Sequence, residues 1–407
     1  MSIYKIVVIL HSSHFSTMAS SSSTNPMIIC LFLLFLSLQT KHASSSPWSL
    51  SACYDSIIGF GDSLADTGNL GNLYPSDPPL FMYLPPYGET FFHHPTGRCS
   101  NGRLIIDFIA RYLDLPLVPP FYDGKNSSDV GSVNFAVAGA SALPDSYFLS
   151  KGIAIRQANT SLSDQLGWFK NKFLPKFQCP SERQSFLRSA LVLVGEVGGN
   201  DYNHALLDGT SKDLVFTFIP DVVGAISSTV KELINLGART LIVPGNLPIG
   251  CSATYLSQFK SSNKSDYNPK TGCLNWLNEF VSNHNKQLRA QLDLIQKEHP
   301  HTDIIYADYY NAAMRFYLHP DKYGFSKGAL TACCPKCGPY KVDNPEAETC
   351  DVPSQYVSWD GLHLTEAAYS ILAKGLIKES YTIPQIEQIC ANHMFNRSYA
   401  VPPRIVL

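Results

Sequence analysis

Charged residues are scarce in this chain, and they form no cluster of one sign. They make up 16% of its 407 residues, the formal net charge is −2, and no basic run occurs. A nucleic-acid partner therefore has no electrostatic basis. The chain also lacks a fixed-period repeat and a low-complexity linker, which argues against a repeat architecture. Hydrophobic residues reach 45%, enough for a large core.

Long apolar runs are equally scarce. The ten-residue run 27–36 is too short to span a bilayer, and polar residues follow it at 39–42. Small residues at Ala43 and Ser45 then suit cleavage before Ser46. The pattern predicts a signal peptide over residues 1–45, with Met18 as an alternative start. We therefore expect a secreted, extracellular protein, or a vacuolar one, with no stable membrane anchor.

The cysteines agree with export. Of 11 cysteines, Cys30 lies in the leader, and an even number remains: Cys53, Cys99, Cys179, Cys251, Cys273, Cys333, Cys334, Cys337, Cys350 and Cys390. Such a set in an exported chain predicts disulfides, whose pairing stays open. Cys334 and Cys337 have the spacing of a zinc ligand pair, but no second pair follows, so we expect no metal site.

Four sequons fit passage through the secretory pathway. They stand at Asn126, Asn159, Asn263 and Asn396. Each predicts a glycosylated surface position.

Strand-type and helical patterns alternate along the mature chain. Apolar β-type runs occupy 56–60, 133–137, 190–194, 239–243 and 303–307, and helical spacing occupies 104–113, 213–236, 275–297 and 365–378. This alternation predicts a single α/β domain over residues 46–407, a three-layer α/β/α sandwich with a mainly parallel sheet and a site at the carboxyl ends of its strands. Two long irregular stretches, 71–103 and 318–358, are the predicted substrate rim.

Gly61-Asp62-Ser63-Leu64 places a serine directly after the first predicted strand. A serine hydroxyl becomes a good nucleophile only when a base removes its proton and donors await the oxyanion. The alternative interpretation of Ser63 is a helix N-cap.

Two further patterns provide partners for such a serine. Asp360 and His363 lie three residues apart, which lets one turn supply a base and the carboxylate that orients it, although Asp360 could instead cap the following helix. Asn200, which follows the strand 190–194, could donate to an oxyanion or merely form a turn. Gly139 could offer a backbone N–H or allow a tight bend.

These blocks stand in the order of the four blocks of the GDSL, or SGNH, hydrolases: Gly61-Asp62-Ser63-Leu64, Gly139, Gly198-x-Asn200-Asp201 and Asp360-x-x-His363. The chain resembles the plant branch of that family from about Tyr54 to Thr382. The stretches 87–92 and 94–98 look most similar to the sinapine-esterase and acetylajmalan-esterase-like subgroup. The resemblance implies a flavodoxin-like fold and esterase or lipase activity.

Carried over by position, the resemblance implies that Ser63 is the nucleophile, His363 the general base and Asp360 the residue that orients it. The oxyanion hole would combine the backbone N–H groups of Ser63 and Gly139 with the Asn200 side chain, Gly131 being an alternative to Gly139. No cofactor is implied.

The same resemblance implies hydrolysis of carboxylic esters of small plant metabolites through an acyl-enzyme, by a protein that is expected to be monomeric. Acyl transfer by the same residues is one alternative. A secreted binding or defence protein without turnover is another.

Three other features look functional but are not expected to be. Gly324-x-Ser326-x-Gly328 matches the nucleophile elbow of α/β-hydrolases, yet no buried strand precedes it. His93 and His94 lack a carboxylate pattern beside them, which disfavours a metal site. His284 lies on the core stripe of its helix and reads as a core-edge residue.

Overall fold

The computed structural model describes residues 53–123, 130–154, 160–340, 342–343 and 348–399. A six-stranded sheet runs through the unit formed by Ser49–Leu407, in the order β2-β1-β3-β4-β5-β8. Its strands are β1 (Ser56–Phe60), β2 (Val133–Asn134), β3 (Ala190–Val194), β4 (Thr240–Pro244), β5 (Asp303–Ala307) and β8 (Thr382–Ile383). All neighbours pair in parallel except β8, which is antiparallel to β5. The predicted mainly parallel sheet is confirmed.

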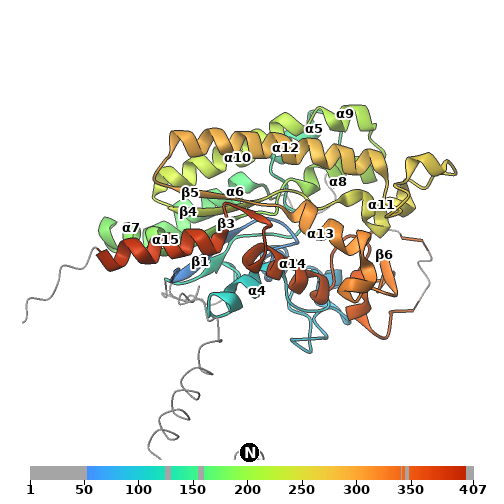
Figure 1. Ribbon diagram of the computed structural model, residues 1–407, viewed down its shortest axis with the longest axis horizontal. Coiled ribbons are helices and arrows are strands. Elements are labelled where there is room, and N and C mark those ends of the chain that lie inside the picture. The colour runs from blue at the N-terminus through green and yellow to red at the C-terminus, as the bar shows by residue number, and fades with distance from the viewer. Residues whose placement is uncertain (1–52, 124–129, 155–159, 341, 344–347, 400–407) are drawn as a thin grey trace, which may run out of the picture. The chain divides into compact units, whose positions relative to one another are not determined.

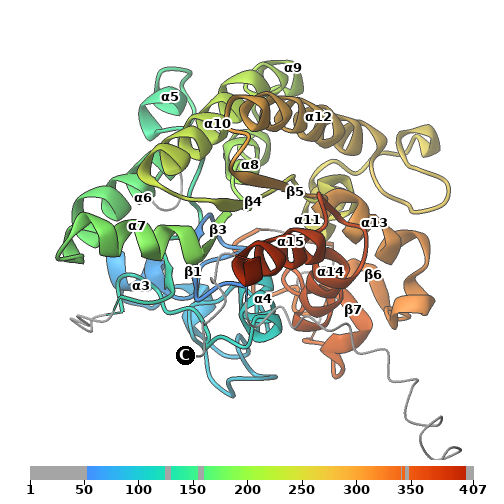
Figure 2. The ribbon, with the colours of Figure 1, turned by 60° about the vertical axis from the view of Figure 1, so that its left-hand side comes forward.

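Helices cover both faces of this sheet (Figure 1). The helices of the described residues are α3 (Asn69–Leu73), α4 (Ile105–Tyr112), α5 (Asp145–Leu149), α6 (Leu162–Trp168), α7 (Pro180–Ser189), α8 (Gly199–Leu207), α9 (Lys212–Phe216), α10 (Ile219–Leu236), α11 (Ala253–Gln258), α12 (Asn275–Glu298), α13 (Tyr309–Leu318), α14 (Glu366–Lys378) and α15 (Ile386–Tyr399). Helices α10 and α12 lie on one side of the strands, and α4 and α14 on the other (Figures 1 and 2).

The alternation of side chains along the strands explains the three layers. Ile58 and Val192 face a core cluster that they share with α6, α10 and α12. Ile57 and Leu191, one position earlier, face a second cluster shared with α4, α13 and α14. Because successive strand residues point to opposite faces, two cores form on one sheet. The fold is the predicted α/β/α sandwich.

Two predicted elements differ in extent. The strand expected over 133–137 ends at Asn134, whose side-chain oxygen accepts the Ala136 N–H at 3.1 Å. The helix expected over 213–236 is divided into α9 and α10. Pro220 causes this break, because proline lacks an N–H and its ring clashes with the carbonyl of the residue four positions earlier in a continuous helix.

By length and composition alone, Lys212–Leu236 would suffice to cross a membrane, with a mean hydropathy of 1.4. Half of this stretch is buried within the fold, and α10 packs against α12 and α6. We therefore interpret α10, the main part of this stretch, as a core helix.

Four disulfides join cysteines in the described residues: Cys53–Cys390, Cys251–Cys273, Cys333–Cys350 and Cys334–Cys337. Cys99 and Cys179 are free. The predicted disulfides are present, and Cys99 and Cys179 lie outside them. Cys334 and Cys337, which have the spacing of a zinc ligand pair, form a disulfide with each other.

A second sheet is small and carries one of the predicted motifs. It pairs β6 (Gly328–Ala332) with β7 (Tyr356–Ser358). Asp360 and His363 follow β7 directly, ahead of α14. The backbone N–H of Trp359 donates to the His363 carbonyl at 2.8 Å, which closes the turn between them.

Candidate active site

Ser63 lies in a tight turn after β1 and is not a helix cap. The N-cap of the next helix, α3, is Gly68. Asp62 organises the turn: its carbonyl accepts the Asp66 N–H at 2.8 Å, and its carboxylate accepts the Leu64 N–H at 2.9 Å. One residue earlier, Gly61 exchanges two hydrogen bonds with the Gln165 side chain of α6. The serine is therefore held on a fixed backbone at the carboxyl end of the sheet.

The Asp360–His363 turn is likewise not a helix cap. Thr365 caps α14 by accepting the Ala368 N–H at 3.2 Å. The carbonyl of Gly361 accepts from the Thr254 N–H and from the Ser252 hydroxyl, at 3.1 and 2.6 Å. These contacts tie the turn to the start of α11.

The structure brings the three residues together across 300 positions of sequence. Nε2 of His363 lies 2.9 Å from Oγ of Ser63, and Nδ1 of the same ring lies 2.6 Å from Oδ2 of Asp360. All three side chains are buried or nearly so, with Ser63 8% exposed. This is the geometry that a base needs in order to take a serine proton while a carboxylate holds its other nitrogen.

The electrostatics of the pair follow from its burial and its contacts. Burial alone would lower the pKa of His363, but the Asp360 charge, the hydrogen bond to it and the nearby Cys99 raise that pKa well above its ordinary value. Burial alone would raise the pKa of Asp360, but His363 and a hydrogen bond from Tyr87 outweigh it and lower that pKa. The positive form of the imidazole is thus strongly stabilised.

Asn200 lines the same cavity as Ser63 and His363, and Gly139 follows β2 in the chain. Asn200 is the second residue of α8, and its Nδ2 donates to Oδ2 of Asp62 at 3.2 Å and to the Ala140 carbonyl at 3.0 Å. Both amide hydrogens are thus engaged, so an oxyanion would have to share or replace one of these bonds. Gly139 has a positive φ of 84°, which favours glycine there.

The strand register separates Gly139 from its alternative, Gly131. Val133 pairs with Ile58 in parallel, and Ser63 follows the far end of that strand. Gly131 precedes β2 and so lies at the amino end of the sheet, opposite Ser63. Gly139 follows β2 and lies at the same end as the serine.

A cavity opens beside Ser63 and His363. Its wall is mostly apolar with a few polar groups, and it is lined by Asp62, Ser63, Leu64, Glu196, Gly199, Asn200, Asn203, Leu247, Pro248, Ile249, Ser252, Tyr317, Ser358, Gly361, Leu362, His363 and Leu364. None of these comes from 71–103, a stretch that the structure describes in full, and within the described part of 318–358 the cavity is lined by Ser358 alone. The described parts of these two stretches therefore contribute little to the wall of this cavity.

Two buried carboxyls border the same cavity. Burial raises the pKa of Asp62 to about 7, which the Leu64 N–H and His363 partly oppose. Burial also raises the pKa of Glu196 well above its ordinary value, helped by the negative charge of Asp62. Two such acids side by side cannot both ionise easily, so this wall carries at most part of its formal charge near neutral pH.

The other sequence candidates lie elsewhere. Ser326 is exposed, and it precedes β6 instead of following a buried strand. His93 and His94 are exposed and contact backbone carbonyls. His284 is fully buried, deeper than the predicted core edge, with its Nδ1 2.7 Å from the Tyr202 hydroxyl.

The predicted glycosylation positions are only partly described. Asn263 is exposed, and its side chain accepts the Ser265 N–H. Asn396 falls within α15, with its side chain outside the described part, and Asn126, Asn159 and the predicted signal peptide lie outside the described residues.

Two carboxylates that organise the site were not singled out in the sequence. Oxygen atoms of Asp66 accept four backbone N–H groups, from Gly68, Asn69, Leu70 and Ala138. Asp201 accepts those of Ala142 and Leu143. Both acids stand within or just after the quoted blocks, so block position could have singled them out. Together they fix the loop that carries Gly139.

The chain is similar to known proteins over most of its length. Residues 57–376 match the family described as GDSL-like Lipase/Acylhydrolase. A GDSL esterase/lipase of Arabidopsis thaliana is 48% identical over 372 residues, which cover 89% of this chain and 95% of that protein.

This chain belongs to the GDSL lipase/acylhydrolase family.

A sinapine esterase of Brassica napus is 45% identical over 382 residues, 91% of this chain and 96% of that protein. Among solved structures, an extracellular lipase from Streptomyces rimosus aligns with 82% of this chain and 98% of its own at 12% identity and a TM-score of 0.32. Membership in this family makes the chain a carboxylic ester hydrolase of the GDSL type.

Proposed function

We propose that this GDSL hydrolase is a secreted serine esterase that cleaves esters of small metabolites through an acyl-enzyme. The observation that carries the proposal is the chain of contacts from Ser63 through His363 to Asp360, at 2.9 and 2.6 Å. Ser63 is the nucleophile, His363 the general base and Asp360 the residue that orients the imidazole.

The reaction proceeds in two halves. Oγ of Ser63 attacks the ester carbonyl while Nε2 of His363 takes the serine proton, and Asp360 stabilises the resulting imidazolium. The C–O bond then breaks, and the leaving alcohol receives that proton. In the second half a water molecule gives a proton to His363 and attacks the acyl carbon, and Ser63 regains its proton as the acid leaves.

The oxyanion formed in each half is assigned to the backbone N–H groups of Ser63 and Gly139 and to the Asn200 amide. Proximity supports this assignment, because Asn200 already bonds to Asp62 and Ala140, the neighbours of Ser63 and Gly139. An oxyanion accepts more strongly than a neutral carbonyl, so it can displace one of these contacts.

Small-metabolite esters are favoured by the relative named sinapine esterase and by the mixed lining of the cavity. The apolar wall formed by Leu247, Pro248 and Ile249 suits an acyl or aromatic group. Secretion is supported by four disulfides, which persist in oxidising compartments.

The test compares three variants of the secreted protein on a p-nitrophenyl ester and with a fluorophosphonate probe. Ser63→Ala should abolish both turnover and labelling. Asn200→Ala should keep labelling at a slower rate and lower kcat on the order of 10²–10³-fold. Ser326→Ala, the matched control at an exposed serine, should behave as wild type. Full activity in Ser63→Ala would overturn the assignment, and failure of wild type to react with the probe would favour a binding protein.

A further inference from the structure

Tyr87 contacts the triad from behind. Its hydroxyl donates to Oδ2 of Asp360 at 2.8 Å, across 273 positions of sequence. This is the same carboxylate oxygen that lies 2.6 Å from Nδ1 of His363. Tyr87 is only 2% exposed and is absent from the cavity lining, so its hydroxyl serves the carboxylate and not a substrate.

The tyrosine ring is held by aromatic packing. Trp359, the neighbour of Asp360, meets the Tyr87 ring edge-on at 5.8 Å between centroids, and Phe81 lies tilted at 5.6 Å. Such contacts restrict the ring to one orientation. The hydroxyl is therefore presented to Asp360 by a rigid support.

The segment around Tyr87 is anchored to the body of the domain. The Gly88 N–H donates to the Ser100 carbonyl, and the Thr90 N–H to the Asn101 carbonyl, at 3.1 and 2.9 Å. A buried ion pair with two contacts of 2.8 Å joins Arg98 to Asp107 of α4. The stretch predicted as a substrate rim thus packs against the triad as a support.

The carboxylate of Asp360 uses both oxygens fully. Oδ1 accepts the backbone N–H groups of Leu362 and His363, at 3.0 and 2.8 Å. Oδ2 accepts from the His363 ring and from Tyr87. Oδ2 is thus held by two donors, the imidazole and the Tyr87 hydroxyl. Removal of the hydroxyl would leave the buried Asp360 charge with one fewer hydrogen-bond partner.

We propose that Tyr87 is a positioning residue of this esterase, whose hydroxyl holds Asp360 in the orientation that fixes the His363 imidazole and moderates the pull of the carboxylate on its proton. The inference rests on the proposed roles of Ser63, His363 and Asp360. Without the hydroxyl, Oδ2 concentrates its charge on the His363 ring, and the imidazolium becomes more stable.

Other titratable groups also face this pair. The Cys99 thiol lies against His363, the Asp62 carboxyl approaches it from the Ser63 turn, and Asp66 and Tyr369 interact with members of the same group. None of them replaces the hydroxyl at Oδ2, because the hydrogen bonds to that oxygen come from Tyr87 and His363.

The test is Tyr87→Phe in the full secreted chain, with Tyr83→Phe as the matched control. Tyr83 lies four residues away, and within the described residues its hydroxyl bonds to backbone groups of Gly68 and Gly71. In Tyr87→Phe, kcat should fall on the order of 10-fold with KM little changed, because a hydrogen bond to a charged group is lost while the cavity is untouched. The acid limb of the pH profile of kcat/KM should move to higher pH.

The control should keep the wild-type acid limb. An unshifted limb and unchanged kcat in Tyr87→Phe would overturn the proposal, as would an equal loss in both variants, which would indicate loosening of the segment. If Tyr87→Phe does not fold, replacement of Tyr87 by 3-fluorotyrosine gives a stronger donor of nearly the same shape, and the limb should then move to lower pH.

The proposed function can fail separately. Retained activity in Ser63→Ala would contradict it without bearing on Tyr87. In that case NMR of the His363 ring proton still tests the contact between Tyr87 and Asp360. The pH midpoint of the His363 titration should move upward in Tyr87→Phe and not in Tyr83→Phe. An unchanged titration in both would overturn the positioning role.

Discussion

At the scale of single residues, the site depends on shared hydrogen-bond acceptors. Asp360 receives donors from His363, Leu362 and Tyr87, and this dense set keeps its carboxylate ionised although it is fully buried. An ionised Asp360 in turn stabilises the protonated imidazole. The pH at which His363 can act as a base is therefore set by its partners.

This stabilisation predicts the pH dependence of activity. Only the neutral imidazole can accept the Ser63 proton, and the raised pKa of His363 keeps the ring protonated to a higher pH than the ordinary value of 6.5. We expect kcat/KM to rise with pH through a value above 6.5 and to be lost as the pH falls through it. Rates on an aryl ester across pH 5–9 check this. A plateau that extends below pH 6.5 would contradict it.

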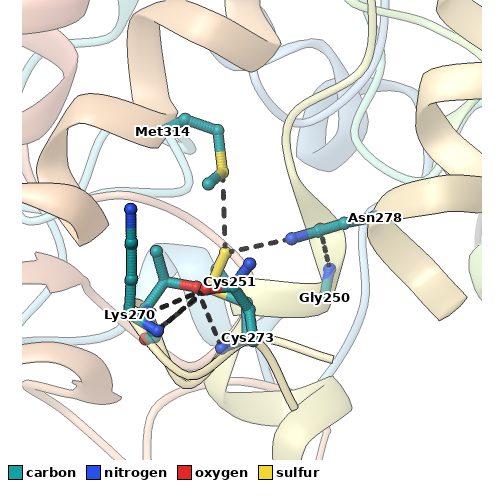
Figure 3. Close-up of a disulfide and its surroundings, with 8 residues drawn as sticks. Gly250, Cys251, Lys270, Cys273, Asn278 and Met314 are labelled. Carbon is teal, nitrogen blue, oxygen red and sulfur yellow. Dashed lines mark hydrogen bonds between the residues drawn. A yellow bond between two sulfur atoms is a disulfide. The ribbon is translucent and has the colours of Figure 1, made fainter. Parts of the chain in front are cut away.

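At the scale of elements, one cavity wall is held by a disulfide. The 3-10 turn η5 (Ile249–Cys251) follows β4 and supplies Ile249 to the cavity. Cys251 is joined to Cys273, just before α12, and the Gly250 N–H donates to Asn278 of that helix at 3.0 Å (Figure 3). The sulfur atom of Met314, on α13, lies 4.0 Å from the sulfur atom of Cys251. Three elements therefore meet at this bond.

Removal of this bond should destabilise the whole domain. The Cys251→Ser, Cys273→Ser double variant frees a loop with a sequence separation of 22, and we expect the free energy of unfolding to fall by about 3 kcal/mol from the entropy of the opened chain. Denaturant unfolding followed by fluorescence checks this. Cys179→Ser, at an exposed free cysteine, is the control. Equal stability of the double variant and this control would contradict the prediction.

The helices and strands also show which elements local sequence patterns can predict. Strands β1, β3, β4 and β5 and helices α4, α12 and α14 were predicted to within about two residues, because each has clear apolar periodicity. The two-residue strand β8 was missed, since two residues carry no pattern. The break between α9 and α10 was missed because Pro220 fell inside an otherwise regular helical run.

At the scale of the whole molecule, the buried His284 makes the stability of the folded domain depend on pH. It lies on α12 with no exposed surface, against Tyr202 of α8, and burial lowers its pKa from 6.5 to about 4. The unfolded chain therefore binds a proton between pH 6.5 and 4 that the folded domain does not. The contribution of His284 to the free energy of unfolding is therefore fully present above pH 6.5 and declines as the pH falls toward 4.

This difference in proton binding predicts that the free energy of unfolding falls by on the order of 3 kcal/mol between pH 6.5 and pH 4 because of His284. His284→Leu should flatten the pH dependence of the free energy of unfolding in this range, whatever its effect on stability at pH 7. Denaturant unfolding at several pH values from 4 to 7 provides the measurement. A wild-type slope in His284→Leu would refute the linkage.

The sequence by itself determined the class of fold and the family. Strand and helix periods are local properties, so they can be read along the chain, and the blocks around Ser63, Gly139, Asn200 and His363 are short enough to recognise in order. Tertiary structure alone decided which groups support them. Tyr87 and Asp360 meet across 273 positions, and which cysteines pair, which glycine lies near Ser63 and which wall lines the cavity depend on strand register and packing between distant segments. Those contacts are set by the closing of the whole core, and no local pattern encodes them.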